Sequence, residues 1–348
     1  MGIKKLSVLL AFIAIAVIFQ QCSKSDVGTT TPTTVIRPTL PATTLNYSIT
    51  YPAHIANALT LTDNTPIDNA ITNDGATLGR VLFYDKQLSK NNTVSCGSCH
   101  KQNQSFDDND VLSKGFDGGL TTRHSMTLLN VRFYKSGKMF WDERAATLEK
   151  QVLQPIQNHV EMGLTLAELE SKVKALDYYP SLFQKAFGST QIDSVKIAKA
   201  LAQFVRSIVT YQSKYDRVKQ GLETFTADEA QGEQLFLNAP PTCAGCHRPP
   251  MFLTSEPVAP FALQDVNDRG INNENRFKAG SLRNCGIRSS LFHNGSIANV
   301  QAMLTGGGRP PIPAHTVAPP DVPKLLAFLN TLTDQTILTE AKFSNPFP

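Results

Sequence analysis

Two short motifs in this chain determine how it folds: Cys96-Gly97-Ser98-Cys99-His100 and Cys243-Ala244-Gly245-Cys246-His247. Both have the pattern C-x-x-C-H, which is the attachment signature of a c-type haem. Two thiols one helical turn apart can bond the two vinyl groups of one haem, and the adjacent His can then reach the iron as its proximal ligand. The sequence therefore predicts two covalently bound haems, with His100 and His247 as iron ligands.

Two other functions of paired cysteines fit these stretches less well. Zinc sites are often built from C-x-x-C pairs, but the His directly after each pair and an export signal at the N-terminus favour haem. A thioredoxin-like redox pair would be expected as a single motif in a βαβ pattern, and neither stretch has that context.

The surroundings of the two haem motifs repeat each other. Gly79-x-x-Leu82-Phe83 precedes the first motif and Gly232-x-x-Leu235-Phe236 precedes the second, while Phe106 and Phe252 follow the two histidines. A Gly permits close contact between helices, and an aromatic ring can cover the edge of a haem. The duplication predicts two cytochrome c-like domains.

Helical periodicity dominates the remainder of the chain. The expected helix starts are Thr165, Ser194, Thr226 and Asp321. Thr165 and Thr226 each have a Glu three residues later, which makes a capping box, and the helix that Ser194 caps is expected to end near Gly221. No segment alternates clearly enough to demand a large sheet. The predicted class is mostly α, with each domain wrapping one covalently bound haem in long loops.

Length and charge are consistent with two domains and with a small-molecule or protein partner. A chain of 348 residues with 41% apolar residues can bury more than one core. We expect an N-terminal haem domain over residues 51–220 and a C-terminal haem domain over residues 221–348. The net charge of +4 is too small to argue for nucleic acid.

The first residues predict a targeting segment rather than part of the fold. Lys4 and Lys5 precede an apolar stretch, residues 6–19, that is shorter than the roughly 20 residues of a membrane span. Cys22 follows directly after two glutamines, which resembles a bacterial lipoprotein signal. We expect residues 1–22 to be this signal, with Cys22 lipid-anchored on the periplasmic side of a bacterial membrane, and an uncleaved anchor is the alternative. Residues 23–50, rich in Thr and Pro, predict an extended linker.

Several stretches outside the haem motifs match one known family in the same order. They are Leu82-Phe83-Tyr84-Asp85 with Leu88-Ser89, Phe140-Trp141-Asp142-Glu143-Arg144-Ala145, Pro155-Ile156-Gln157 with Val160-Glu161-Met162-Gly163, and Ser281-Leu282-Arg283-Asn284 leading to Leu291-Phe292-His293-Asn294-Gly295-Ser296. In these stretches the chain resembles the bacterial di-haem cytochrome c peroxidase family, which also contains the MauG-type enzymes that mature methylamine dehydrogenase. The resemblance extends from about Leu78 to Thr333.

The resemblance implies roles for matching residues. The N-terminal haem would react with hydrogen peroxide and the C-terminal haem would pass electrons. Glu161 matches the family's distal acid-base carboxylate and Gln151 a neighbouring distal amide, and cleavage of the peroxide O–O bond needs such a group to move a proton. Trp141 matches the aromatic residue between the haems, where it could relay an electron, with a packed core residue as the alternative.

The other matching residues are expected to support the haems. Arg283 is expected to face a haem propionate, because a guanidinium suits a carboxylate. His293 is expected to have a structural role near the second haem, and Met251 to pack beside it. Cys285 lies outside the motifs and is expected to be a small buried apolar residue.

Three departures from the family pattern change the expectations. Phe116 stands where many members place a His that blocks the peroxidatic iron, so this iron should be open unless His124 or His159 takes the position. Gly307 stands where the family has the distal Met or Tyr of the second haem, which leaves Met303 as the nearest replacement ligand and His315 as a remote one.

The third departure concerns calcium. The positions of the family's inter-domain calcium site correspond to His124, Arg288 and Ser290, none of which matches the family's residues. Main-chain carbonyls could still bind the ion, so calcium binding stays open.

Three functions remain open from the sequence. The first is a peroxidase that takes electrons from a small cytochrome c or a cupredoxin. The second is a MauG-type oxidase that withdraws electrons from the side chains of a partner protein. The third is a non-catalytic electron carrier, against which Glu161 and Gln151 argue. The sequence leaves the oligomeric state open, a homodimer included.

Overall fold

The computed structural model describes residues 35–238, 243–254, 268–306 and 315–348. These residues form helices joined by long loops, and pairing between extended segments is limited to isolated bridges within the same ranges. The mostly α class is therefore confirmed. The α-helices are α1 (Ala53–Thr62), α2 (Asn73–Tyr84), α3 (Cys96–Cys99), α4 (Leu148–Gln151), α5 (Leu153–Gln157), α6 (Leu166–Ala175), α7 (Tyr179–Phe187), α8 (Ser194–Ser207), α9 (Lys214–Lys219), α10 (Ala227–Asn238), α11 (Cys243–Cys246), α12 (Val300–Leu304) and α13 (Val322–Asn330).

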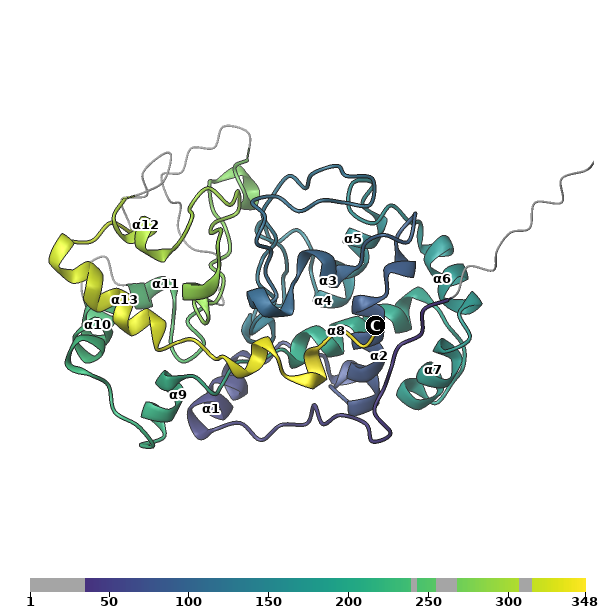
Figure 1. Ribbon diagram of the computed structural model, residues 1–348, viewed down its shortest axis with the longest axis horizontal. Coiled ribbons are helices and arrows are strands. Elements are labelled where there is room, and N and C mark those ends of the chain that lie inside the picture. The colour runs from purple at the N-terminus through teal and green to yellow at the C-terminus, as the bar shows by residue number, and fades with distance from the viewer. Residues whose placement is uncertain (1–34, 239–242, 255–267, 307–314) are drawn as a thin grey trace, which may run out of the picture. The chain divides into compact units, whose positions relative to one another are not determined.

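The helix before each haem motif packs closely against a later helix, and the same contact occurs twice (Figure 1). A Cβ atom at Gly79 of α2 would lie 2.0 Å from the carbonyl oxygen of Ala200 in α8. A Cβ atom at Gly232 of α10 would likewise lie 2.0 Å from the carbonyl oxygen of Lys324 in α13. Only glycine permits these crossings, so the repeat seen in the sequence is a repeat of helix packing.

Two of the expected helix starts are confirmed in detail. Thr165 and Glu168 form a reciprocal capping box at the start of α6. At the start of α10 the backbone N–H of Thr226 donates to the Glu229 carboxylate at 2.8 Å. Asp321 precedes α13 as expected, although its side chain makes no capping hydrogen bond.

The helix expected from Ser194 to near Gly221 differs from the structure at both ends. Asp193, not Ser194, caps α8, because its carboxylate accepts a hydrogen bond from the Lys196 N–H at 2.8 Å. The helix ends at Ser207, and a separate short helix, α9, follows. Between them the backbone N–H of Thr210 donates to the Asn130 side chain at 3.0 Å. Side chains from other segments thus satisfy backbone groups that would otherwise continue the helix.

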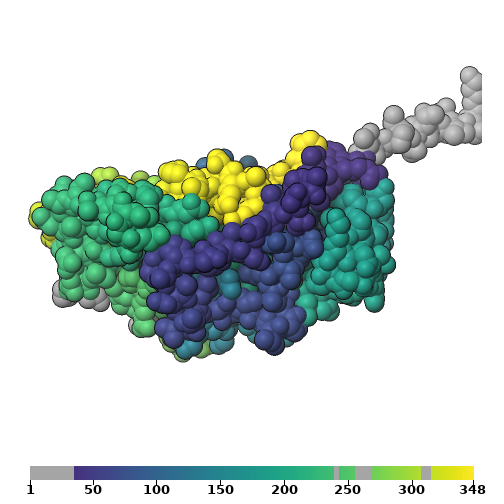
Figure 2. All heavy atoms as spheres, turned by 90° about the horizontal axis from the view of Figure 1, so that it is seen from below, coloured from purple at the N-terminus to yellow at the C-terminus, as the bar shows by residue number. Residues whose placement is uncertain are grey.

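The two ends of the described chain lie side by side on one face (Figure 2). The N–H of Thr39 donates to the carbonyl of Pro346 at 2.7 Å, and the hydroxyl of Tyr47 donates to the carbonyl of Lys342 at 2.6 Å. Residues 37–50 have no helix, as expected of a linker, but Tyr47 is buried and so anchors this segment to the body. The expected signal, residues 1–22, and the first part of the linker lie outside the described residues.

Buried apolar side chains form two clusters. The larger contains Phe83, Phe106 and Phe204, together with Ile337 and Phe343 from the end of the chain. The smaller contains Phe236, Phe252 and Phe328, and it surrounds the second haem motif. No helix in the described ranges is long and apolar enough to cross a membrane.

Candidate functional site: two haem cavities

The first haem motif forms one helical turn that presents both thiols and the following histidine. α3 begins with a hydrogen bond from the N–H of Ser95 to the hydroxyl of Ser98 at 3.0 Å. The Nδ1 atom of His100 lies 3.1 Å from the carbonyl oxygen of Phe106, which orients the ring and leaves Nε2 for a metal. Burial lowers the pKa of His100, so the ring is kept in the neutral form that binds iron.

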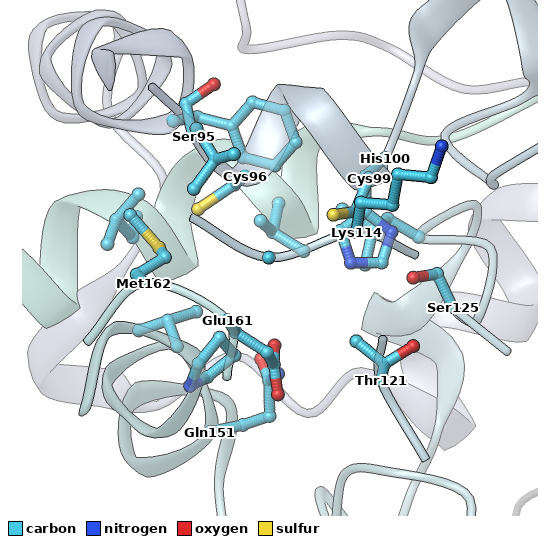
Figure 3. A pocket seen from close by; sticks show the side chains of 18 residues that line it. Ser95, Cys96, Cys99, His100, Lys114, Thr121, Ser125, Gln151, Glu161 and Met162 are labelled. Atoms are coloured by element: carbon cyan, nitrogen blue, oxygen red, sulfur yellow. The ribbon is translucent and has the colours of Figure 1, made fainter. Parts of the chain in front are cut away.

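The first cavity brings together most of the residues expected at the peroxidatic site. Cys96, Cys99, His100, Gln151 and Glu161 all line it. Figure 3 shows the side chains of Glu161 and Gln151 next to each other, across the cavity from the haem motif. The paired thiols and the neighbouring His100 are the groups that a c-type haem requires.

A tight loop between α5 and α6 positions Glu161. The side chain of Asn158 accepts a hydrogen bond from the Glu161 N–H at 3.3 Å, and the Glu161 carbonyl accepts one from the Phe116 N–H at 3.0 Å. Burial raises the pKa of Glu161, and the positive charge of Arg144 partly offsets this. A carboxyl group with a raised pKa can both accept and deliver a proton near neutral pH.

Gln151 is held by the short helix α4. Its N–H donates to the carbonyl of Thr147 at 3.0 Å, and Glu149 of the same turn forms an ion pair with the buried Arg206 of α8 at 2.5 Å. The pair fixes α4 against α8, and so it fixes the wall from which Gln151 faces the cavity.

Phe116, His124 and His159 do not line the first cavity. The ring of Phe116 packs against Gly163, where an added Cβ atom would lie 2.6 Å from the ring. His124 is buried elsewhere in contact with Asp107, and His159 is exposed. Among the described residues around this cavity, His100 is thus the only histidine.

The second haem motif repeats the arrangement of the first. The Nδ1 atom of His247 lies 3.3 Å from the carbonyl oxygen of Phe252, and both Phe106 and Phe252 have positive φ angles. The cavity of about 730 Å³ that His247 lines is walled mainly by the loops after residue 268. Burial, helped by the nearby His315, lowers the pKa of His247 to about 4.

Met303, His293 and His315 line this second cavity together with His247. Met303 comes from α12, and His315 lies shortly before α13. His293 is buried and stacks on Phe277, with ring centroids 3.8 Å apart and planes 9° apart. A stacked, packed ring is what the expected structural role of His293 requires.

Trp141 lies at the junction of the two sites. It lines the second cavity and also a small neighbouring cavity of about 260 Å³, which shares Ser125 with the first cavity. Its indole N–H donates to the carbonyl of His124 at 2.7 Å.

The structure gives Arg283 a different partner from the one expected. Its guanidinium is fully buried and forms two hydrogen bonds of 2.7 Å with the carboxylate of Asp216. Asp216 is also buried, and its pKa, which burial alone would raise, is lowered to about 2 by Arg283. Both terminal nitrogens of Arg283 are thus occupied by a protein carboxylate, and a contact with a haem propionate stays a prediction. The cationic side chains that line the second cavity are instead Lys278 and Arg288.

The remaining expectations concern packing. Cys285 is buried in the smaller cluster, as expected. Met251 is buried as expected, but it packs in the larger cluster. Asp107 and Lys278, both buried, were not predicted from the sequence. Asp107 directly follows Phe106, which has the same place after the first haem motif as Phe252 has after the second. This repeat could have pointed to Asp107.

Comparisons with known proteins agree with this geometry. Residues 73–224 match a family described as di-haem cytochrome c peroxidase. The chain is 32% identical over 317 residues to cytochrome c551 peroxidase from Nitrosomonas europaea, covering 86% of this chain and 92% of the relative. It is 30% identical to methylamine utilization protein MauG from Methylophilus methylotrophus, covering 69% and 73% of the two chains.

Solved structures have the same fold. A MauG-like protein associated with microbial copper homeostasis superposes with a TM-score of 0.74 at 26% identity, covering 87% of this chain and 99% of that one. The diheme peroxidase BthA from Burkholderia thailandensis superposes with a TM-score of 0.64 at 21% identity, covering 90% and 99% of the two chains. With its two haem motifs and its likeness to relatives over most of their length, the chain belongs to the di-haem cytochrome c peroxidase family, a family of oxidoreductases.

Proposed function

We propose that this enzyme reduces hydrogen peroxide to water with electrons from a small periplasmic redox protein, a cytochrome c or a cupredoxin. The observation that carries the proposal is the convergence of Glu161 and Gln151 on the cavity that His100 lines. An electron carrier needs no buried carboxyl group with a raised pKa facing its iron site.

The residues that line the first cavity would have different roles in the reaction. Cys96, Cys99 and His100 would hold the haem, whose iron supplies the electrons and the coordination site for peroxide. Glu161 would take the proton from the near oxygen of peroxide and deliver it to the far oxygen, which leaves as water. Gln151 would hold the substrate in place with its side-chain amide.

The second site would receive electrons and pass them on. Cys243, Cys246 and His247 would hold its haem, and we propose that Met303 would be a second ligand of the iron because it lines the same cavity. A thioether ligand raises the potential of a haem. Met303→Ala should therefore lower the potential of the second haem and change its spectrum, whereas an unchanged spectrum and potential would exclude this ligand.

Trp141 is proposed as the electron relay between the sites.

A MauG-type oxidase acting on a partner protein is the second candidate. It is favoured by Phe116, which packs against Gly163 and cannot bind iron. The first haem would then stay open in the fully oxidised enzyme. The same feature predicts that a peroxidase of this type needs no prior reduction.

One experiment separates these functions. The fully oxidised holoenzyme is examined by electron paramagnetic resonance, then mixed with peroxide without reductant, and finally assayed with reduced cytochrome c. We expect a high-spin signal, a direct reaction with peroxide and steady turnover with the donor. A stable oxidised product without donor turnover would favour the oxidase. A purely low-spin resting spectrum with no reaction before reduction would contradict an open first site.

The N-terminal segment of the sequence indicates where in the cell the enzyme acts. We propose that Cys22 carries a lipid anchor and that the enzyme acts on the periplasmic side of a bacterial membrane.

A further inference from the structure

A buried cluster of charged side chains lies between the two haem cavities. The Oδ1 atom of Asp107 lies 3.0 Å from the Nε2 atom of His124, and its Oδ2 atom lies 3.9 Å from the Nη1 atom of Arg288. Asp107 and His124 are 2% and 3% exposed. With Trp141, the three side chains line the small cavity between the haem sites.

The surroundings of His124 favour its protonated, positively charged form. Its Nδ1 atom lies 3.0 Å from the carbonyl oxygen of Val111, and its Nε2 atom faces the Asp107 carboxylate. The Val111 carbonyl can only accept a hydrogen bond, so Nδ1 carries a proton, and the nearby carboxylate favours a second proton on Nε2. Burial alone would lower the pKa of His124, but Asp107 more than offsets this and raises it. Two positive side chains therefore flank one buried carboxylate.

The cluster connects to both haem sites through short contacts. Asp107 follows Phe106, whose carbonyl orients His100. Arg288 donates to the carbonyl of Ser281 at 2.9 Å and lines the second cavity with His247.

The backbone of His124 completes the connection. Its N–H donates to the carbonyl of His293 at 2.8 Å, and its carbonyl accepts the indole N–H of Trp141. The position of His124 thus sets the position of the proposed relay.

This cluster does not suit the calcium ion that the family resemblance implies. Calcium takes six to eight oxygen ligands, but His124 and Arg288 put positive charge at two of the three expected positions. Ser290, the third position, lines the same small cavity, where Asp107 is the only carboxylate among the described lining residues. In the described parts of the chain, no group of three or more acidic, His or Cys side chains could hold a metal ion.

We propose that His124 and Arg288 replace a divalent cation at this junction, and that His124 is a positioning residue that holds Trp141 between the two haem sites. Communication between the sites would then need no calcium. The inference rests on the proposed function, because it assumes that electrons pass between two haems.

The test uses the holoenzyme with both haems attached. The indole band in ultraviolet resonance Raman spectra reports the hydrogen bond of Trp141 without ambiguity, since the chain has one Trp. The rate of electron transfer between the haems is measured after flash reduction of one of them. Both are recorded for the wild type before and after treatment with EGTA and after addition of calcium.

We expect the wild type to respond to neither EGTA nor calcium. His124→Gln should weaken the indole hydrogen bond and slow electron transfer between the haems, because Trp141 would no longer be held in one position. Arg288→Lys, which keeps the charge, should have a smaller effect. Lys185→Gln, which removes a positive charge from an exposed position on α7, should change neither readout.

Different outcomes overturn different conclusions. Transfer that EGTA abolishes and calcium restores would overturn the inference even if peroxide turnover were normal. An unchanged indole band in His124→Gln would also overturn it. If that variant failed to bind both haems, the EGTA experiment and Arg288→Lys would decide. Absence of peroxide turnover with the expected indole shift would contradict the proposed function and leave the role of His124 supported.

Discussion

At the scale of single residues, the two haem cavities differ in what faces the histidine of the motif. The first has the carboxyl group of Glu161 and the amide of Gln151, whereas the second has Met303 and His315. The first set can move protons, and the second can bind iron. The difference supports the proposed division between a site that reacts with peroxide and a site that relays electrons.

Glu161→Gln tests the proton transfer directly. The amide preserves the size of the side chain but cannot carry the proton, so both haems should attach while peroxide reduction slows by roughly 10²–10⁴-fold. Steady-state turnover with reduced cytochrome c measures the effect. Glu274→Gln is the matched control, because its side chain is 51% exposed and lies outside both haem cavities. Near-native turnover of Glu161→Gln would remove this residue from the mechanism.

The pH dependence of the reaction should report the same carboxyl group. Burial raises the pKa of Glu161 above its usual value of 4.5, so the proton-accepting form is lost at a higher pH than for an exposed Glu. The rate constant for peroxide should fall as the pH decreases through this raised pKa. Arg144→Gln removes a positive charge that lowers the pKa and should move the fall to higher pH. If the rate constant of Arg144→Gln falls at the same pH as that of the wild type, a group other than Glu161 is responsible for the pH dependence.

At the scale of elements, helix starts were predicted better than helix ends. The capping boxes at Thr165 and Thr226 are local patterns, so the sequence contains all the information they need. The end of α8 is set by Asn130 and Asp334, whose side chains accept hydrogen bonds from the backbone of residues 210–212. Contacts between distant segments leave no periodic pattern. The same reason explains why the partner of Arg283 was not predicted.

The paired helix crossings make a prediction at this scale. Gly79→Ala and Gly232→Ala each place a Cβ atom against a backbone carbonyl, so the helices must separate. We expect each change to lower the free energy of unfolding by roughly 1–3 kcal/mol or more, the usual cost of overpacking. Chemical denaturation measures the loss. Val195→Ala, at a side chain that is 63% exposed on α8, should stay within about 0.5 kcal/mol of the wild type.

At the scale of the whole molecule, the twofold repeat was predictable because the motifs and their flanking glycines are duplicated in the sequence. The contact of the chain's end with the larger cluster was not, since Ile337 and Phe343 lie far from the residues they cover. Phe343 packs beside Phe106 and Phe204, with ring centroids 6.2 Å and 6.3 Å away. The last residues therefore belong to the core around the first haem.

Removal of residues 337–348 should damage the first haem site while sparing the second. The larger cluster would lose Ile337 and Phe343, and burying one such side chain is worth about 1.5–3 kcal/mol. We expect a lower melting temperature and an altered spectrum of the first haem, with the second haem nearly unchanged. Removal of Pro348 alone is the control. Equal damage to both haems would show that the segment stabilises the molecule as a whole.

The returning C-terminal segment also has a consequence for the order in which the protein is made. The hydroxyl of Tyr84 donates to the carbonyl of Phe343 at 2.7 Å, and the ring of Tyr84 lies against Gly97 within the first haem motif. Domains begin to fold from the N-terminus during synthesis, yet the carbonyl that Tyr84 contacts lies 259 residues further along the chain. Cys96 and Cys99 therefore emerge well before this partner of Tyr84, and α2 can make the contact only after the later segment has been made.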